Sequence, residues 1–310
     1  MELKELFGEF KNKKILVVGD VSIDEFVYGK IVKISAEAPV PVIGIELRAH
    51  ILGQAGNVAT NISAMSAYPL ISGVIGEDDE GKVLMEKLKD ITEINGIFAD
   101  TSRPTTLKTR IMVKNHQMLR IDREENHGIS MDLMKKIVGY VNDKDFDGIV
   151  VSDYMNGTVT SELLSNLPTE KPIVIGPKIN TSLDYNNTIL VANEEKVKGV
   201  YGINIITETS IRNIGIKVMS HLGCRNFVMT RGKEDVAVFG EDTFDKVNTY
   251  GGEALNKVGV VDTFMAALIL SLTSNIDIVK SVEIANYVSG IKIKDMSMGI
   301  MNLKEVMKND

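Results

Sequence analysis

Two aspartates lie directly after the first apolar segment of the chain. Residues 15–19 have the length and hydrophobicity of a buried strand, and Asp20 and Asp24 follow them. Ligands of open α/β sheets bind at the carboxyl ends of the strands, where carboxylates accept hydrogen bonds well from the vicinal hydroxyls of a sugar. These residue types favour polyol recognition. Aspartate and serine are also ordinary turn residues, and this segment alone does not separate the two interpretations.

Small residues precede an amphipathic helical stretch at residues 53–61. Gly53 and its neighbours Ala55 and Gly56 allow a ligand to approach the backbone closely. Asn57 is then either the N-cap of the helix or a contact to the ligand. A glycine pair by itself is weak support for a binding site, but next to the aspartates after residue 19 it strengthens the prediction of a sugar site.

The stretch that says most about catalysis is Gly259-Val260-Val261-Asp262, which runs into an apolar helical segment. The first amides of a helix have no acceptor within the helix and carry the positive end of its dipole. Residues 259–262 are therefore suited to hold a transferring phosphoryl group. Asp262 would take the proton from the attacking hydroxyl, or orient it. The alternative is an aspartate that only caps the helix.

Basic residues are concentrated between positions 103 and 123, where Asp122 is the single acid. The six basic residues are Arg103, Lys108, Arg110, Lys114, Arg120 and Arg123. Some of them are expected to point at an anionic substrate such as a phosphorylated sugar. Alternatively, they prevent the edge strand of a sheet from pairing with another chain.

The elements that would position these residues alternate between strand-length apolar runs and amphipathic stretches of helical period, which predicts an α/β fold around a mostly parallel sheet. Strands are predicted at 15–19, 70–76, 148–152, 173–176, 189–192 and 227–230. Helices are predicted at 57–67, 81–88, 131–142, 210–222, 262–272 and 278–294. No repeat or linker divides the chain, so residues 1–310 are predicted to form one domain.

Two stretches, 26–47 and 105–124, break this alternation and are predicted to be short strands separated by turns. Both follow strands of the main sheet, so they are expected to meet over its carboxyl edge as a small β lid. The alternative is a surface sheet without a function.

Composition narrows the classes of function. The chain has 310 residues, 44% of them hydrophobic, and a net charge of −7, which disfavours nucleic acid and anionic lipid as partners. Cys224 is the single cysteine, no apolar run reaches membrane-spanning length, and the first residues carry no apolar signal core. These features predict a soluble protein of the reducing cytoplasm.

Several common nucleotide and metal motifs are missing. No glycine-rich turn follows residues 15–19, which disfavours a dinucleotide-binding domain, and the Gly-Lys pairs at Gly29, Gly81 and Gly232 do not complete a P-loop. The four histidines are scattered, which gives a zinc site little support.

The order of the motifs resembles that of ribokinase-type (PfkB) sugar kinases. The resemblance covers nearly the whole chain and rests on Asp20 with Asp24, residues 53–61, 76–81, 152–154, 230–232 and 259–262. Residues 34–42, 108–110, 117–122 and 152–157 are most similar to the D-glycero-β-D-manno-heptose-7-phosphate kinase domain of the bifunctional enzymes of ADP-heptose biosynthesis. The second, nucleotidyl-transferring half of those enzymes is not among these 310 residues.

The resemblance implies a ribokinase-like three-layer α/β/α core, a β lid, ATP and Mg²⁺ as cofactors, and a homodimer formed through the lids. The residues implied for catalysis are Asp262 as the base and Gly259, Val260 and Val261 as the anion hole. Those implied for substrate binding are Asp20, Asp24, Gly53, Asn57 and Asp153, with Lys108, Arg110 and Arg120 near the substrate phosphate. Those implied for the nucleotide are Lys178, Asn193, Thr230, Arg231 and Gly232, and for the metal Asn193 and Glu195.

The chain departs from the family pattern on the nucleotide side. Val260 and Val261 replace the Ala-Gly of the usual Gly-Ala-Gly-Asp, and a β-branched residue disfavours the positive φ that the second glycine permits. Gly176 and Lys196 stand where acidic residues are usual, and Asn256 replaces another aspartate. These departures keep open the alternative of a weakened relative that binds sugar phosphate or a partner. A third alternative is a kinase of an unphosphorylated sugar or nucleoside, in which Lys108 and Arg110 would contact no substrate phosphate.

Overall fold

A nine-stranded sheet forms the centre of the part of the chain that the computed structural model describes, residues 3–114, 116–203, 207–250 and 259–294. Its order is β13-β12-β11-β10-β9-β8-β1-β4-β5, parallel from β5 to β11 and antiparallel at β12 and β13. The strands are β1 Lys14–Gly19, β4 Tyr68–Ile75, β5 Ile97–Ala99, β8 Gly148–Asp153, β9 Ile173–Pro177, β10 Ile189–Asn193, β11 Asn226–Thr230, β12 Val236–Phe239 and β13 Phe244–Val247. The predicted mostly parallel α/β sheet is confirmed.

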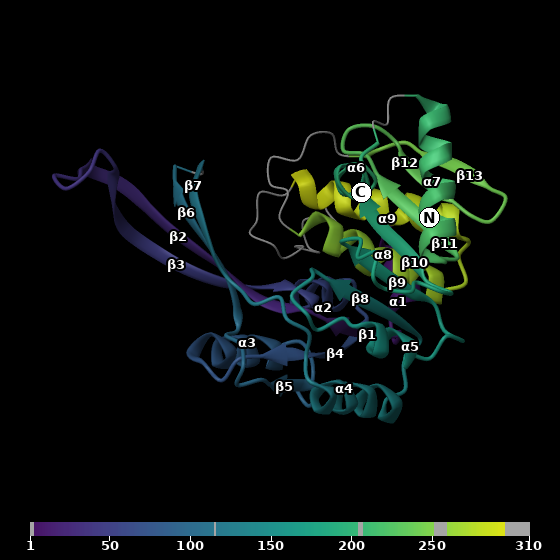
Figure 1. Ribbon diagram of the computed structural model, residues 1–310, viewed down its shortest axis with the longest axis horizontal. Helices are drawn as coiled ribbons and strands as arrows, with labels where there is room; N and C mark the ends of the chain where they lie inside the picture. Colours follow the sequence, from purple (N-terminus) through teal and green to yellow (C-terminus); the bar gives the residue numbers. More distant parts are fainter. Residues whose placement is uncertain (1–2, 115, 204–206, 251–258, 295–310) are drawn as a thin grey trace.

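Helices cover both faces of this sheet, which gives three layers (Figure 1). One face packs against α1 Leu3–Phe10, α2 Ala55–Ala64, α3 Asp79–Lys89, α8 Val260–Thr273 and α9 Ile278–Lys294. The other packs against α4 Met131–Asp143, α5 Ser161–Ser165, α6 Glu194–Tyr201 and α7 Glu208–Leu222. In β1, Ile15 and Val17 face the first layer and Leu16 and Val18 face the second. Because both faces are covered, residues 15–18 are apolar without interruption.

No helix among the described residues combines the length and hydropathy needed to cross a bilayer.

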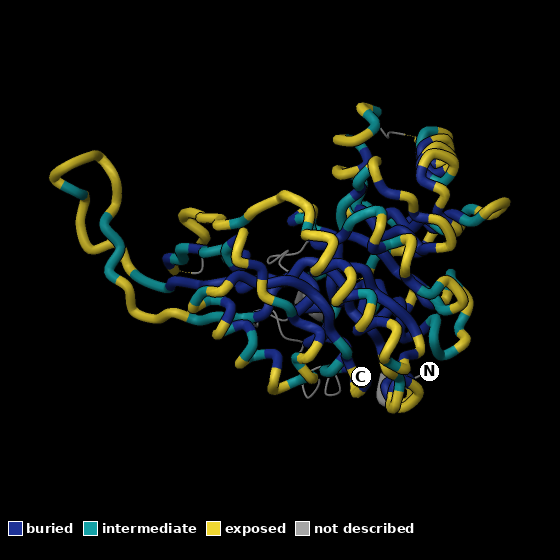
Figure 2. Tube along the Cα trace, turned by 60° about the horizontal axis from the view of Figure 1, so that its bottom comes forward, coloured by how far each residue is buried: buried dark blue, intermediate teal, exposed yellow. Residues whose placement is uncertain are grey.

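A second sheet of four strands, in the order β3-β2-β6-β7, forms the lid. Its strands are β2 Val21–Ile34, β3 Pro41–Gln54, β6 Thr106–Val113 and β7 His116–Arg123. Figure 1 shows β2 and β3 extending far from the body with β6 and β7 beside them, and Figure 2 shows that exposure increases toward the end of this arm. The structure thus brings together the two stretches that were predicted to meet.

The prediction of several short strands in the first of these stretches is wrong. Residues 21–54 form one hairpin of two 14-residue strands, with register shifts after Tyr28 and Ile31. Bulges of this kind interrupt the alternation of inward and outward residues without ending a strand. An interrupted alternation of apolar and polar residues in the sequence therefore looks the same as a turn between two short strands.

Two helices also begin at other residues than the sequence predicts. The N-cap of α2 is Gln54, so Asn57 lies inside the helix and the prediction of Asn57 as an N-cap is wrong. The strand β3 continues directly into α2, which starts two residues before Asn57. Helix α8 starts at Val260 with Gly259 as its N-cap, so Asp262 is the third residue of the helix.

Candidate active site

The sheet topology places the predicted site residues along one edge. Asp20 follows β1, Asp153 ends β8, Lys178 follows β9, Asn193 ends β10 and Thr230 ends β11. These five strands are parallel neighbours in that order. Their carboxyl ends therefore form a continuous row, with the residues predicted for the sugar at β1 and β8 and those predicted for the nucleotide at β9 to β11.

Asp262 is held by two other elements at both of its carboxylate oxygens. The amide of Asn57 on α2 donates to Oδ2 at 2.6 Å, and the hydroxyl of Tyr154, in the loop after β8, donates to Oδ1 at 2.6 Å. Only 3% of Asp262 is exposed, and the N-cap of α8 is Gly259, not Asp262. The alternative in which Asp262 merely caps the helix is therefore wrong.

A chain of buried hydrogen bonds joins α2 to α8 behind this carboxylate. The amide nitrogen of Asn61 donates to Oδ1 of Asn57 at 3.1 Å and to its carbonyl oxygen at 2.6 Å. The hydroxyl of Thr263 donates to Oδ1 of Asn61 at 2.9 Å. Asn61 and Thr263 are both fully buried, so this network fixes the side chain of Asn57 before it reaches Asp262.

The start of α8 accommodates the two valines that replace small residues of the family pattern. Gly259 has φ of 73°, a left-handed conformation that glycine adopts without strain. Neither Val260 nor Val261 has a positive φ, and both belong to the first turn of the helix. The expected conflict between a β-branched residue and a positive φ does not arise at residues 259–262.

Asp20 binds a loop of its own chain. Its Oδ2 accepts hydrogen bonds from the backbone N–H groups of Tyr154 at 2.8 Å and Asn156 at 3.0 Å, and its Oδ1 accepts from that of Thr158 at 3.1 Å. Only 1% of Asp20 is exposed. Its geometry is that of an internal anion that organises the 154–158 loop, and its role as a sugar ligand stays a prediction.

Asp24, Ser22 and Gly53 are closely packed at the base of the lid. A Cβ atom on Gly53 would lie 2.3 Å from Oγ of Ser22 and 2.9 Å from Oδ2 of Asp24. The buried Oγ of Ser22 and Oε1 of Gln54 have no hydrogen-bond partner among the described residues. Buried polar groups are normally paired, so these two atoms have capacity for hydrogen bonds to a bound ligand.

Arg110 pairs with Asp24 inside the lid. Its Nη1 donates to Oδ1 of Asp24 at 2.7 Å, and its guanidinium lies 5.2 Å from the ring centroid of Phe26. Each side chain of the ion pair is less than a tenth exposed. Because β6 lies between β2 and β7, Arg110 and Lys108 are not on an edge strand, and protection of an edge does not explain them.

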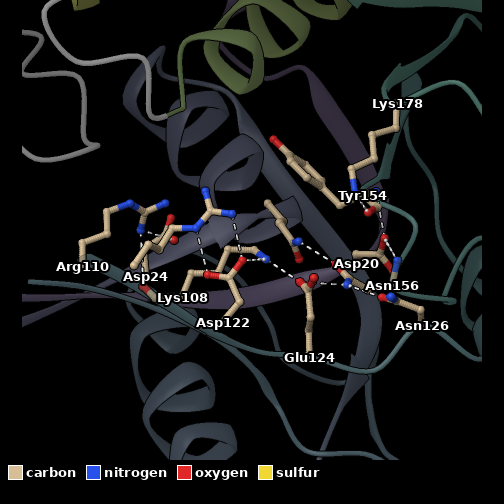
Figure 3. Close-up of polar contacts among 12 residues, drawn as sticks. Asp20, Asp24, Lys108, Arg110, Asp122, Glu124, Asn126, Tyr154, Asn156 and Lys178 are labelled. Carbon is tan, nitrogen blue, oxygen red and sulfur yellow. Dashed lines mark hydrogen bonds and ion pairs between the residues drawn. The ribbon is translucent and has the colours of Figure 1, made fainter. Parts of the chain in front are cut away.

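The other two predicted phosphate contacts, Lys108 and Arg120, also have carboxylate partners, and Figure 3 shows Lys108 between Asp122 and Glu124. Lys108 Nζ lies 3.4 Å from Oδ2 of Asp122 and contacts Oε2 of Glu124 more closely. Arg120 binds both oxygens of Asp122 at 2.9 Å. Burial alone would raise the pKa of Glu124, but the hydrogen bond and the charge of Lys108 outweigh it and hold that pKa below its ordinary value.

Glu124 also connects the lid to the 154–158 loop. The amide nitrogen of Asn156 donates to Oε2 of Glu124 at 3.1 Å, and Nε2 of Gln54 donates to Oδ1 of Asn156 at 2.8 Å. The lid strands and the loop after β8 are therefore parts of one polar network (Figure 3).

Asp153 is buried beside Asp20. Its Oδ1 accepts a hydrogen bond from the backbone of Met155 at 2.8 Å, and its Oδ2 has no partner among the described residues. Burial, followed by the negative charge of Asp20, raises the pKa of Asp153 to about 7. The carboxyl group is 1% exposed, and its role in substrate binding stays a prediction.

On the nucleotide side, Asn193 caps α6 by accepting a hydrogen bond from the N–H of Lys196 at 2.8 Å. Arg231 donates to Glu194 at 2.8 Å and to Asp235 at 2.6 Å. Glu195 lies in the first turn of α6 and is exposed.

Thr230 ends β11, and Gly232 has a left-handed φ of 65°.

Among the described residues, no group of three or more His, Cys, Asp or Glu side chains is arranged to hold a metal ion. Asn256 lies outside the described residues.

The structure separates the basic residues that the sequence groups together. Arg103 is 8% exposed and donates to Asp100 at 2.8 Å and to the carbonyl oxygens of Asn156 and His127 at 2.8 and 2.7 Å. It therefore supports the loop after β8 from inside. Tyr154 was not predicted as a site residue, although the 152–157 segment was among the motifs. The signal for it in the sequence is an aromatic residue directly after the strand-end aspartate Asp153.

Comparisons with known proteins identify the family of the chain. Residues 12–305 match the model of the pfkB family of carbohydrate kinases. The chain is 30% identical over 315 residues to the bifunctional protein HldE of Geobacter metallireducens and 31% identical over 313 residues to that of Helicobacter hepaticus. Each alignment covers 98% of this chain but only 64% and 65% of the relative, so the chain spans just under two thirds of their length.

Solved structures share the fold. The ribokinase of Arabidopsis thaliana, solved with ribose and ATP, superposes with a TM-score of 0.72 at 16% identity, over 96% of this chain and 98% of that one. Phosphofructokinase-2 of Escherichia coli, solved with potassium, gives a TM-score of 0.75 at 12% identity, over 96% and 97%. The ribokinase-like fold with a small lid sheet is thus confirmed. Together with the family match across nearly the whole sequence, these findings show that the chain belongs to the pfkB family of carbohydrate kinases, which are phosphotransferases.

Proposed function

We propose that the chain transfers the γ-phosphoryl group of ATP to a hydroxyl of a phosphorylated sugar, with D-glycero-β-D-manno-heptose 7-phosphate as the preferred substrate. The observation that carries the proposal is the buried carboxylate of Asp262, which lies in the first turn of α8 and is held by groups from two other elements. A base next to the amides of a helix start is what phosphoryl transfer to an alcohol requires.

The proposed reaction uses these groups in one step. The acceptor oxygen forms a bond to the γ-phosphorus while the bond from that phosphorus to the β–γ bridging oxygen breaks. The proton of the hydroxyl passes to Asp262, and ADP leaves. The first amides of α8 donate to the phosphoryl oxygens, where negative charge must be stabilised.

Mg²⁺ fits this arrangement through one side chain in particular. Mg²⁺ is usually bound by one or two carboxylates together with substrate phosphates and water, and Glu195 offers an exposed carboxylate in the first turn of α6. Asn193 fits less well, because its oxygen already accepts the N–H of Lys196. When bound with ATP, the ion would neutralise charge on the phosphates.

The lid supplies the cations for a phosphate on the sugar. The side chains of Lys108 and Arg110 are 15% and 8% exposed, whereas that of Arg120 is 52% exposed. A substrate phosphate would share these cations with the carboxylates that hold them in place. These are Asp24 for Arg110, Asp122 and Glu124 for Lys108, and Asp122 for Arg120. The choice of a heptose 7-phosphate is supported by the relatives named HldE and by the segments that resemble heptose kinases.

Measurement of ADP release with heptose 7-phosphate, fructose phosphates, ribose and adenosine, each with and without Mg²⁺, tests the substrate. Asp262→Asn should lower turnover about a hundredfold to ten-thousandfold, the range for loss of a general base, while calorimetry shows the sugar still bound. Full turnover in this variant would contradict the proposed mechanism. Sugar phosphate binding without nucleotide binding would instead favour the weakened relative, which Lys196 and Gly176 suggest.

We also propose that two copies associate through their lids. The arm carries many exposed apolar side chains, namely Ile31, Val32, Ile34, Val40, Ile45, Leu47, Met118, Leu119 and Ile121. An apolar surface of this kind is typical of an interface. Light scattering should give a dimer for the native chain and a monomer for the double variant Ile45→Glu, Leu47→Glu. A native monomer at micromolar concentration would refute the association.

A further inference from the structure

Tyr154 connects three strands of the sheet to the carboxylate on α8. Its backbone N–H donates to Asp20 after β1 at 2.8 Å, and its carbonyl oxygen accepts a hydrogen bond from Nζ of Lys178 after β9. Tyr154 itself follows β8. Its peptide groups are therefore held from both neighbouring strands, and Figure 3 shows its ring lying beside Lys178 and above Asp20.

The hydroxyl of Tyr154 donates the 2.6 Å hydrogen bond to Oδ1 of Asp262 described above. Burial, then the charge of Asp262 and its hydrogen bond, raise the pKa of Tyr154 well above its ordinary value. The phenol is therefore neutral near pH 7 and acts there as a hydrogen-bond donor.

We propose that Tyr154 is a positioning residue for phosphoryl transfer, whose hydroxyl acts with the amide of Asn57 to fix both oxygens of Asp262 in the direction of the acceptor alcohol. This inference rests on the proposed role of Asp262 as the base. A carboxylate on a flexible Cα–Cβ bond samples several rotamers. Donors at both of its oxygens hold the carboxylate in one orientation toward the incoming hydroxyl.

The alternative role for Tyr154 is packing alone. Its ring would then matter and its hydroxyl would not. The variant Tyr154→Phe separates the two roles because it keeps the ring and removes only the oxygen. A matched control is Tyr140→Phe on α4, because the buried Tyr140 also donates its hydroxyl to a carboxylate, Oε1 of Glu93, at 2.8 Å.

The test compares wild type, Tyr154→Phe and Tyr140→Phe in ADP release with heptose 7-phosphate and Mg-ATP, with sugar affinity measured by calorimetry. Tyr154→Phe should lower kcat about tenfold to a hundredfold, the loss expected for one hydrogen bond to a charged group, with little change in sugar affinity. Tyr140→Phe should keep wild-type kcat. A Tyr154→Phe enzyme with wild-type kcat, or with weakened sugar binding that accounts for the whole loss, would overturn the inference.

A double variant asks whether Tyr154 acts through Asp262. In the Asp262→Asn background, Tyr154→Phe should cause no further loss of the residual rate, because residues that act as a unit are not additive. Additive losses would show an independent role and overturn the inference. Wild-type enzyme without turnover would overturn the proposed function as well. This inference alone would be overturned if wild type is active, Asp262→Asn is inactive and Tyr154→Phe is fully active.

Discussion

Replacement of Asp20 by alanine should destabilise the protein, although the sequence presents Asp20 as a sugar ligand. The carboxylate is 1% exposed and accepts three backbone hydrogen bonds, at 2.8, 3.0 and 3.1 Å. Asp20→Ala leaves the three N–H groups without this acceptor. Hydrogen bonds to a charged group contribute about 1.5 kcal/mol each at the lower end of their range.

The sum of about 4.5 kcal/mol is reduced in part because Asp20→Ala removes the repulsion between Asp20 and Asp153. We therefore expect a loss of about 3 to 4 kcal/mol. At roughly 2 °C for each kcal/mol in a chain of this size, the melting temperature should fall by about 6 to 8 °C.

Differential scanning calorimetry of wild type and variant measures this shift. Asp145→Ala is the control, because the side chain of Asp145 is 86% exposed and its ion pairs with Lys14 and Lys171 are 3.7 and 3.9 Å long. Its melting temperature should stay within about 1 °C of wild type. A shift of less than about 2 °C for Asp20→Ala would refute the conclusion that this carboxylate anchors the 154–158 loop.

Two further predictions concern the same region. Because burial and Asp20 raise the pKa of Asp153 from 3.8 to about 7, its protonated form stabilises the folded state below about pH 4, and this contribution is lost as the pH rises through about 7. The stability of Asp153→Asn relative to wild type, from urea unfolding, should therefore increase between pH 5 and pH 8; a constant difference would contradict the raised pKa. Gly53→Ala places a Cβ 2.3 Å from Oγ of Ser22 and 2.9 Å from Oδ2 of Asp24. Gly53→Ala should raise the KM for the sugar about tenfold or more, which corresponds to a loss of at least about 1.4 kcal/mol of binding free energy. The KM for ATP should not change. An unchanged KM for the sugar would mean that the sugar does not bind beside Gly53.

Local patterns in the sequence were enough to predict the sheet and the apolar helix that begins near residue 260. Ile15 to Val18 are apolar without interruption because both faces of β1 are covered, and this signal needs no knowledge of distant residues. Gly259 to Asp262 lead into an apolar helix for an equally local reason, since the glycine takes the left-handed φ that precedes the helix. Such features depend on neighbours a few residues away.

The partner of each polar side chain was decided only by the tertiary structure. Tyr154 and Asp262 are 108 positions apart, and Asp20 is 134 positions from Tyr154, so their contacts exist only because β1 and β8 are neighbours in the sheet and α8 packs against β8. Arg103 and Lys108 belong to the same basic stretch of the sequence, yet Arg103 is buried under the loop after β8 and Lys108 lies on the lid. Hydrogen bonds and ion pairs form between whichever groups the packing of distant elements brings within about 3 Å, and local sequence does not record that proximity.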